Sequence, residues 1–321
     1  MDIKEKIALI KRNTVEIVTE EELEKLLKEK KQPVTYCGYE PSGPIHLGHL
    51  VTLTKLMDLQ KAGFKVKILL ADIHAYLNKK GDFKKIEQEM EHWSKGIKAL
   101  GLKAEVIKGT SFQFKKEYWT DVLDCSLKTS IQRGLRSMQE IARDVDNAMI
   151  SQIFYPLMQI MDIKHLDVDV AQGGIEQRKI HMLARELLPE AGYKAPVCVH
   201  TPLITSLKGP GSKMSKSIPG SGISVIDSEE EIKQALKNAY CPEKVVEDNP
   251  VLQITRLIIF PHLNTFTVER PVKFGGDITF KSYEEVEEIY KTGKLHPMDL
   301  KNAVAVSLEK ITKPIRAYFK K

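Results

Sequence analysis

Short apolar stretches alternate with amphipathic helical stretches through the first two thirds of this chain. Residues 34–38, 65–72 and 104–107 are each long enough for one strand, and helical periodicity fills the segments between them. Asp82 predicts a helix start, because the apolar side chains after it recur from Ile86 onward at helical spacing. Strands and helices in this order predict an α/β fold with a parallel sheet and helices on its faces.

Two further strands are expected at 168–171 and 197–200, with Gly173-Gly174 as a turn into a helix over 175–187. Residues 115–163 contain few turn signals, so they predict a helical block inserted between the third and fourth strands. The sequence therefore predicts a Rossmann-type parallel sheet of about five strands. Ligands bind such sheets at the carboxyl ends of the strands, where the strand order reverses.

The strand–helix alternation stops after a loop at 208–222 that is rich in Gly, Ser and Lys. A capping box is expected at 228–231, and the remainder is predicted to be mostly helical, with a short β-like stretch at 265–280. We place a domain boundary near 223–227. The predicted domains are a nucleotide-binding catalytic domain over 1–225 and a mainly helical domain over 226–321.

The composition of the 321 residues, 42% hydrophobic and 29% charged, excludes a disordered or collagen-like chain. No apolar run approaches the roughly 18 residues of a membrane span, and the amino terminus lacks the apolar stretch of a secretory signal. The four cysteines are far apart and form no CxxC pair, which predicts reduced thiols in a cytoplasmic protein and no metal site. A net charge of +6 permits a polyanionic partner without requiring one.

The first candidate site is a histidine pair directly after the first strand. Residues 41–49 read PSGPIHLGH, with His46 and His49 three residues apart. At a helix start this spacing puts both imidazoles on one face, beside free backbone N–H groups that favour an anion. Gly48 leaves room for a flat ring to lie on the backbone. A helix cap and a surface side chain would be the simpler interpretation of an isolated pair, but the position after a strand favours a phosphate site.

The second candidate site is a basic string within the loop 208–222, which reads KMSKS from Lys213 to Ser217. Two ammonium groups on a Gly- and Ser-rich loop can close over a triphosphate and stabilise the charge that develops as it reacts. Taken alone, five residues are equally compatible with a solvated linker.

Together, the two segments resemble HIGH and KMSKS, the signatures of class I aminoacyl-tRNA synthetases, in order, spacing and strand context. The resemblance implies adenylation of an amino acid by ATP, with Mg²⁺ accompanying ATP, and then transfer to tRNA. Relatives often carry KMSSS, with Ser in place of Lys216. The catalytic side chains implied are His46, His49, Lys213 and Lys216. The ATP-binding residues implied are Gly38, His46, Gly48, His49, Lys213, Met214, Ser215, Lys216 and Ser217.

A third set of residues resembles the tyrosyl-tRNA synthetases of the archaeal and eukaryotic type over nearly the whole chain. Tyr155, Gln159 and Asp162 recur at i, i+4 and i+7, on one helical face. Further matches are Tyr36 in the first strand, GGIEQRK at 173–179, FGGD at 274–277 and HPMD at 296–299. The resemblance implies that Tyr36 and Asp162 bind the phenol of tyrosine, and that Tyr155, Gln159 and Gln177 bind its α-ammonium group. A helix–helix hydrogen-bond network is the alternative interpretation of this polar face.

The same resemblance implies contacts with tRNA. Arg136, Arg178 and Lys179 match positions near the acceptor end, where phosphate and base-edge contacts are plausible, although a basic stripe is usually only a solvated face. Phe274 and Asp299 match residues that read the first anticodon base, by stacking and by accepting a hydrogen bond.

The resemblance thus implies activation of L-tyrosine and its transfer to the 3′ end of tRNA(Tyr), by a cytoplasmic homodimer built partly from residues 115–145. The nearest competing family is the tryptophanyl enzyme. Tyr36 with Asp162 argues for a phenol, because an indole offers only a donor N–H. Two more distant candidates are a small nucleotidyltransferase without tRNA and a degenerate paralogue that binds RNA or acts as a scaffold. The extra helical domain and Arg178-Lys179 count against the nucleotidyltransferase, and the intact HLGH and KMSKS motifs count against the degenerate paralogue.

Overall fold

The computed structural model describes residues 1–141, 147–215 and 218–319, apart from the side chain of Phe274. These residues form two compact units, and the division falls within helix α3 (Leu47–Lys61). The units are Met1–Ser42 with Lys55–Pro202, and Gly43–Thr54 with Leu203–Lys321. The prediction that a catalytic domain ends at residue 225 concerns function rather than compactness, and it stays a prediction.

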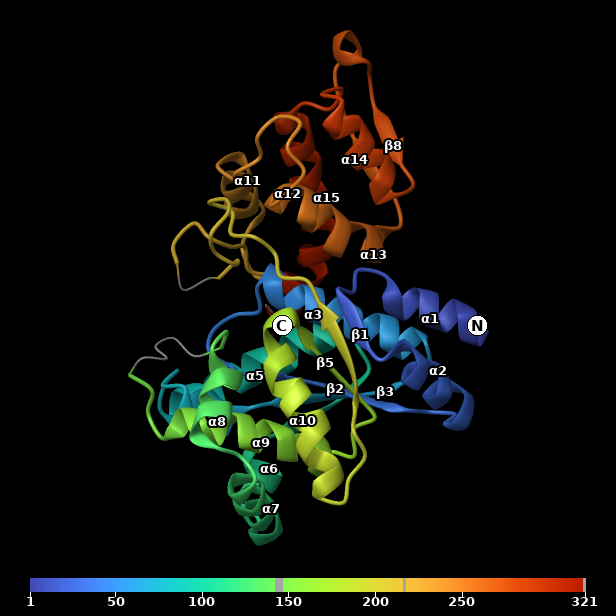
Figure 1. The fold of residues 1–321 in the computed structure, drawn as a ribbon. Coiled ribbons are helices and arrows are strands. Elements are labelled where there is room, and N and C mark those ends of the chain that lie inside the picture. Colours follow the sequence, from blue (N-terminus) through green and yellow to red (C-terminus); the bar gives the residue numbers. More distant parts are fainter. Residues whose placement is uncertain (142–146, 216–217, 320–321) are drawn as a thin grey trace. The chain divides into compact units, whose positions relative to one another are not determined.

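A six-stranded sheet with strand order β1-β6-β5-β2-β3-β4 is the centre of the first unit (Figure 1). Five strands run parallel, which confirms the predicted α/β class. They are β2 Val34–Tyr39, β3 Lys65–Leu70, β4 Ala104–Lys108, β5 Val170–Gly174 and β6 Val197–Thr201. The sequence did not predict β1 (Glu16–Val18), which pairs antiparallel with β6. Its three half-buried residues are too few to show an alternating pattern.

The helices of the first unit begin where the sequence provides caps. Thr19 and Glu22, three residues apart, form a capping box, and Asp82 accepts a hydrogen bond from the backbone N–H of Lys85 at 2.8 Å. The helices of this unit, besides part of α3, are α1 Ile3–Lys11, α2 Glu20–Glu29, α4 Asp72–Leu77, α5 Phe83–Ala99, α6 Thr110–Gln113, α7 Lys116–Leu127, α8 Ile131–Met138, α9 Ser151–His165 and α10 Arg178–Glu190.

The helical block predicted between the third and fourth parallel strands is present as α7, α8 and α9. Helices α8, α9 and α10 lie side by side in the ribbon (Figure 1). Tyr118 of α7 and Met158 of α9 join Tyr36 of β2 in one buried cluster. The inserted helices therefore bury part of their surface against the sheet strand that carries a predicted substrate residue.

The Gly173-Gly174 pair is not the predicted turn. Both glycines belong to strand β5, and a 3-10 turn over Ile175–Gln177 leads into α10. A Cβ on Gly173 would lie 3.0 Å from Cγ of Gln177 and 3.4 Å from Cε1 of His181. Glycine is needed here because two side chains from the following turn and helix pack directly over the strand.

The second unit is mostly helical in its described part, as predicted, with one small hairpin beside α14 (Figure 1). The hairpin strands lie within the predicted β-like stretch, and Ser228 with Glu231 forms the predicted capping box. The elements are α11 Glu229–Lys237, α12 Pro250–Ile254, a π turn Thr255–Ile259, α13 Phe260–Leu263, β7 Phe266–Val268, a 3-10 turn Val272–Phe274, β8 Ile278–Phe280, α14 Tyr283–Lys291 and α15 Pro297–Phe319. None of the described helices is long and apolar enough to cross a membrane.

Candidate active site

The strand order reverses between β2 and β5, the adjacent central strands of the first unit. The chain continues from β2 to β3 and β4 on one side, and returns through β5 to β6 on the other. Parallel sheets bind ligands at the carboxyl ends of the strands at such a point. Tyr36 lies in β2 and Gln177 in the turn that follows β5, so both predicted tyrosine-binding residues belong to this region.

Asp162 is fully buried on α9 and is held by two donors from elsewhere in the unit. Its Oδ1 accepts hydrogen bonds from Nε2 of Gln113 at 2.7 Å and from the hydroxyl of Tyr118 at 2.9 Å. Among the described residues, its Oδ2 has no hydrogen-bond partner. Burial raises the pKa of this carboxyl group to about 7. A buried acceptor oxygen without a donor is costly, which points to a ligand that donates to it.

Tyr36 is also buried and lies under the electrostatic influence of Asp162. Burial, followed by the charge of Asp162, raises the pKa of its phenol well above the usual value, so the hydroxyl stays neutral and can donate or accept. His74 approaches the same carboxylate, with 3.7 Å between its Nε2 and Oδ2 of Asp162. Burial lowers the pKa of His74 to about 4, so this imidazole is neutral at physiological pH.

The other three predicted tyrosine-binding residues form two polar contacts. Nε2 of Gln159 donates to Oε1 of Gln177 at 3.1 Å, which joins α9 to the turn after β5. The hydroxyl of Tyr155 donates to Oε1 of Glu40 at 2.7 Å. A carboxylate, a phenol and two amide oxygens are the kind of acceptors that an ammonium group requires. The assignment of these residues to the α-ammonium group stays a prediction.

Sequence reasoning missed several polar side chains of this region. Glu40 could have been found, because it directly follows a strand and so lies at the carboxyl edge of a parallel sheet. Gln113 and Tyr118 gave no such signal, since they lie 49 and 44 residues from Asp162 in a segment that reads only as helical. Only the packing of α6 and α7 brings them to the carboxylate.

In the second unit, the histidine pair is fixed by backbone hydrogen bonds at the start of α3. Nδ1 of His46 accepts from the N–H of Gly48 at 3.1 Å, and Nδ1 of His49 accepts from the N–H of His46 at 3.3 Å. Their rings stack with centroids 3.7 Å apart. Because Nδ1 accepts in both rings, each neutral imidazole carries its proton on Nε2, where it can donate to a phosphate oxygen.

The two glycines predicted to bind ATP differ in their surroundings. A Cβ on Gly48 would lie 2.9 Å from Cε1 of His46, so the glycine is needed first to admit the ring of His46. Gly38 is exposed within β2, and among the described residues a Cβ there would meet only Cδ2 of Leu69, at 4.0 Å. The open space was expected over Gly48, where the ring of His46 already lies close, whereas Gly38, for which no such space was predicted, has the more open surroundings.

The described part of the loop 208–222 is held from both sides. The backbone of Lys213 bridges to Thr205, and Met214 is buried and donates through its N–H to the carbonyl of Ile204 at 2.8 Å. The N–H of Ser215 donates to Oγ of Ser221 at 3.2 Å. These bonds leave the side chain of Lys213 exposed. Lys216 and Ser217 lie outside the described residues, so their predicted roles stay predictions.

The basic residues predicted to approach the tRNA acceptor end lie on α8 and α10 of the first unit. Arg136 is exposed on α8. Nε of Arg178 donates to Oε1 of Glu16 at 2.6 Å, and Nζ of Lys179 donates to Oε1 of Gln139 at 2.9 Å. All three have exposed or half-exposed side chains at which a polyanion can compete for these contacts.

The residues predicted to read the anticodon lie in two segments of the second unit that one arginine joins. Phe274 ends a 3-10 turn, and Asp299 lies in the first turn of α15. Arg270 donates to the carbonyl of Gly276 at 2.9 Å and to the carbonyl of Lys294 at 3.0 Å. Arg270 therefore connects the loop after Phe274 to the residues just before α15, a link that sequence reasoning missed.

Comparison with known proteins places this chain in the family that the two motifs indicated. Residues 28–313 match the family model of the class I tRNA synthetases (W and Y). The chain therefore belongs to that family, as the resemblance predicted.

Relatives of about 50% identity come from the tyrosine branch of the family. The chain is 51% identical to a tyrosine–tRNA ligase of Archaeoglobus fulgidus and 49% identical to one of Methanopyrus kandleri, each over 98% of both chains. It superimposes on the crystal structure of the tyrosyl-tRNA synthetase of Archaeoglobus fulgidus complexed with L-tyrosine with a TM-score of 0.96, over 99% of both chains.

Proposed function

We propose that this chain is a tyrosine–tRNA ligase, which activates L-tyrosine with ATP and transfers it to tRNA(Tyr). The observation that carries the choice of tyrosine is Oδ2 of Asp162, a buried acceptor with no hydrogen-bond donor among the described residues. A phenol hydroxyl can donate to it and can also bond to the neighbouring hydroxyl of Tyr36. An indole would supply one donor N–H and leave the rest of this polar arrangement unpaired. The full-length similarity to tyrosine–tRNA ligases supports the same choice.

The first step is adenylation of the amino acid. A carboxylate oxygen of tyrosine attacks the α-phosphorus of ATP, a new P–O bond forms, and the bond to pyrophosphate breaks. We expect Nε2–H groups of His46 and His49 and the ammonium group of Lys213 to stabilise the charge that builds on the phosphates. No covalent bond to the protein is required, because orientation and charge stabilisation suffice.

Mg²⁺ is proposed to enter with ATP, bound to its phosphate oxygens. Among the described residues, no group of three His, Cys, Asp or Glu side chains could hold a metal ion. Magnesium keeps several waters and commonly binds the phosphates of a substrate. The ATP phosphates and water can therefore supply most of its ligands.

In the second step, a hydroxyl of the terminal adenosine of tRNA attacks the carbonyl carbon of tyrosyl-adenylate, and AMP leaves. We propose that Arg136, Arg178 and Lys179 bind the acceptor end and that Phe274 and Asp299 contact the anticodon. Asp299→Ala should therefore weaken tRNA charging several-fold, while tyrosine-dependent ATP–pyrophosphate exchange stays near the wild-type rate. Loss of exchange together with charging would instead make Asp299 a residue needed for folding.

A homodimer in the cytoplasm is the proposed form of the enzyme. Several apolar side chains are exposed in and beside the inserted helices of the described chain, as expected of a surface that a second copy covers. They are Phe114, Leu123, Leu127, Ile131, Met149 and Ile150. The four cysteines are free and buried, which suits a reducing compartment.

The decisive experiment is ATP–pyrophosphate exchange measured with each of the twenty amino acids. Tyrosine should support exchange, and phenylalanine and tryptophan should not. Exchange with tryptophan alone would move the chain to the other branch of the family, and exchange with none would remove the proposed enzymatic activity.

A further inference from the structure

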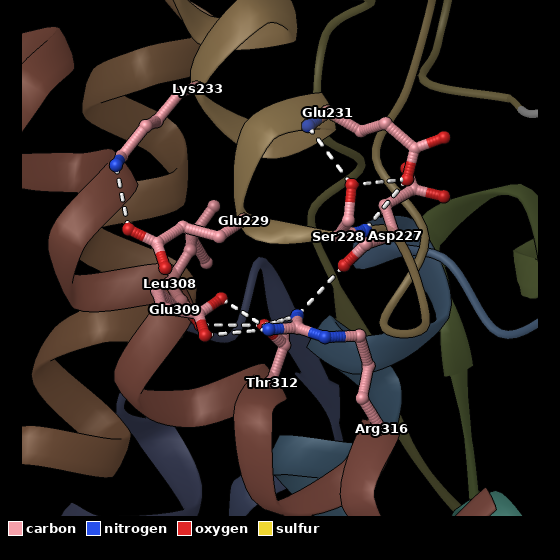
Figure 2. Close-up of polar contacts among 9 residues, drawn as sticks. All are labelled: Asp227, Ser228, Glu229, Glu231, Lys233, Leu308, Glu309, Thr312 and Arg316. Carbon is pink, nitrogen blue, oxygen red and sulfur yellow. Dashed lines mark hydrogen bonds and ion pairs between the residues drawn. The ribbon is translucent and has the colours of Figure 1, made fainter. Parts of the chain in front are cut away.

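Arg316, near the end of α15, donates hydrogen bonds to a backbone carbonyl and to the side chains of Thr312 and Glu309. Nη1 donates to the carbonyl of Asp227 at 2.7 Å and to Oγ1 of Thr312 at 3.0 Å (Figure 2). Nη2 lies 2.6 and 2.5 Å from the two carboxylate oxygens of Glu309. The side chains of Arg316 and Glu309 are only 16% and 15% exposed. The guanidinium is therefore fixed by a largely buried ion pair rather than solvated.

The acceptor in the loop, Asp227, closes a tight turn. Its Oδ2 accepts from the N–H of Ser224 at 2.8 Å, and its own N–H donates to the carbonyl of Ser224 at 3.2 Å. The next residue, Ser228, begins α11 through its capping box with Glu231 (Figure 2). The turn is thus followed directly by α11, and Arg316 binds the carbonyl of its last residue, Asp227.

The other end of this turn lies against the histidine motif. Oγ of Ser224 and the N–H of Val225 both donate to the carbonyl of Ile45, at 3.0 and 2.9 Å. The N–H of Leu47 donates to the carbonyl of Ile223 at 3.0 Å, so His46 and Ser224 face each other in an antiparallel bridge. Ser224 is fully buried. The backbone on both sides of His46 is therefore positioned by residues 223–225.

We infer that Arg316 is a positioning residue for the ATP site: with Glu309 it holds the 224–227 turn, and through that turn the backbone of His46. The inference rests on the proposed function, which makes His46 a phosphate ligand. Arginine suits this role because its planar fork donates to a carbonyl and a carboxylate at once, which the single ammonium of lysine does less well. A displacement of about 1 Å at a reacting centre can lower a rate about a hundredfold.

Helix α15 does not depend on Arg316 alone for its place in the second unit. Leu300, Val304, Leu308 and Ile315 of the same helix are buried. Loss of the guanidinium should therefore leave the helix docked and loosen mainly the turn. The expected defect concerns ATP rather than tyrosine.

The test compares Arg316→Ala and Arg316→Lys with the wild-type enzyme in tyrosine-dependent ATP–pyrophosphate exchange. Arg316→Ala should lower kcat/KM for ATP by about tenfold to a hundredfold, and Arg316→Lys should restore part of the loss. The dissociation constant of tyrosine, measured by equilibrium dialysis, should stay within about twofold. Lys310→Ala is the matched control, because it removes one positive charge from an exposed position of the same helix.

A second pair of variants tests whether the two residues act through the turn. Asp227→Ala removes the bond to the Ser224 N–H, and adding Arg316→Ala should cost little more if both act in series. Glu309→Gln offers a milder change should Arg316→Ala fail to fold, and it should also raise KM for ATP selectively. An unchanged kcat/KM for ATP, or equal losses of tyrosine affinity and exchange, would overturn the inference. Absence of exchange in the wild-type enzyme would overturn the proposed function instead.

Discussion

The predicted tyrosine pocket and the predicted ATP motifs are held in place in different ways. In the pocket, side chains hold side chains: Gln113 and Tyr118 donate to Asp162. In the ATP motifs, most hydrogen bonds of the described residues have a backbone group as one partner, as when Nδ1 of His46 accepts from the N–H of Gly48. The side chains that hold Asp162 come from distant parts of the sequence. The two imidazoles accept from backbone N–H groups two and three residues away, and residues 223–225 hold the backbone beside His46.

This difference separates selectivity from rate. A pocket whose buried polar atoms need a partner penalises any substrate that lacks the matching group. A backbone-held motif instead provides fixed donors for charge that develops during the reaction. Substitutions in the pocket should therefore change which amino acid is used, and substitutions in the ATP motifs should change how fast it is activated.

The largest effect is expected for Lys213→Ala. Loss of one positioned donor to a developing charge typically lowers a rate by about a hundredfold or more, and Lys213 is expected to meet that charge only as pyrophosphate leaves. Single-turnover adenylation should show this loss, while tyrosine affinity stays unchanged. Lys208→Ala removes the same charge from another exposed position of the loop and serves as the control. Equal losses of tyrosine affinity and adenylation rate would contradict the proposal that the ATP motifs affect the rate and not amino-acid binding.

Asp162→Ala should act on selectivity. A hydrogen bond to a charged group contributes about 1.5–3 kcal/mol, so tyrosine activation should fall about tenfold to a hundredfold. Phenylalanine has no hydroxyl that could bond to Asp162, so its activation should change little. The preference for tyrosine over phenylalanine should therefore narrow. Tyrosyl-tRNA synthetases are the standard instance of such rejection of phenylalanine. The measurement is the ratio of exchange rates for the two amino acids. A variant that excludes phenylalanine as well as the wild type would place the phenol elsewhere.

Tyr36→Phe should give a weaker version of the same change. A neutral hydrogen bond contributes about 0.5–1.5 kcal/mol, which corresponds to about two- to tenfold in tyrosine activation. The ring still fills its buried position, so stability should be nearly unaffected. A loss larger than that of Asp162→Ala would reverse the assigned order of the two phenol ligands.

The smallest effect concerns stability and its pH dependence without substrate. The pKa of Asp162 is raised from 3.8 to about 7 by burial, so the unfolded chain releases this proton at lower pH than the folded protein does. The contribution of Asp162 to stability therefore falls as pH rises from about 4 to 7 and stays low above that. Asp162→Asn removes this titration, so its Tm relative to wild type should rise by a few degrees between pH 5 and pH 8. His74 is the same in both proteins, which removes its own titration from the comparison. A Tm difference independent of pH would contradict the assigned cause.

Patterns within short segments were enough to predict much of this protein. Each of the five parallel strands overlaps a short segment that the local sequence predicted as a strand, and the capping boxes at Thr19 and Ser228 need only residues three apart. The orientation of the two imidazoles follows the same rule, since His46 and His49 accept hydrogen bonds from N–H groups two and three residues away. Family resemblance then supplied the reaction, which no periodicity could have given.

The tertiary structure decided what depends on segments far apart in the chain. Arg316 meets the carbonyl of Asp227 across 89 residues, and Asp162 meets Gln113 across 49. Strand β1 exists because β6 offers it a partner, and Gly173 is required because Gln177 and His181 pack over it. Local preferences choose helices and strands, but the pairing of buried polar groups follows from which elements pack together, and a sequence read segment by segment does not contain that information.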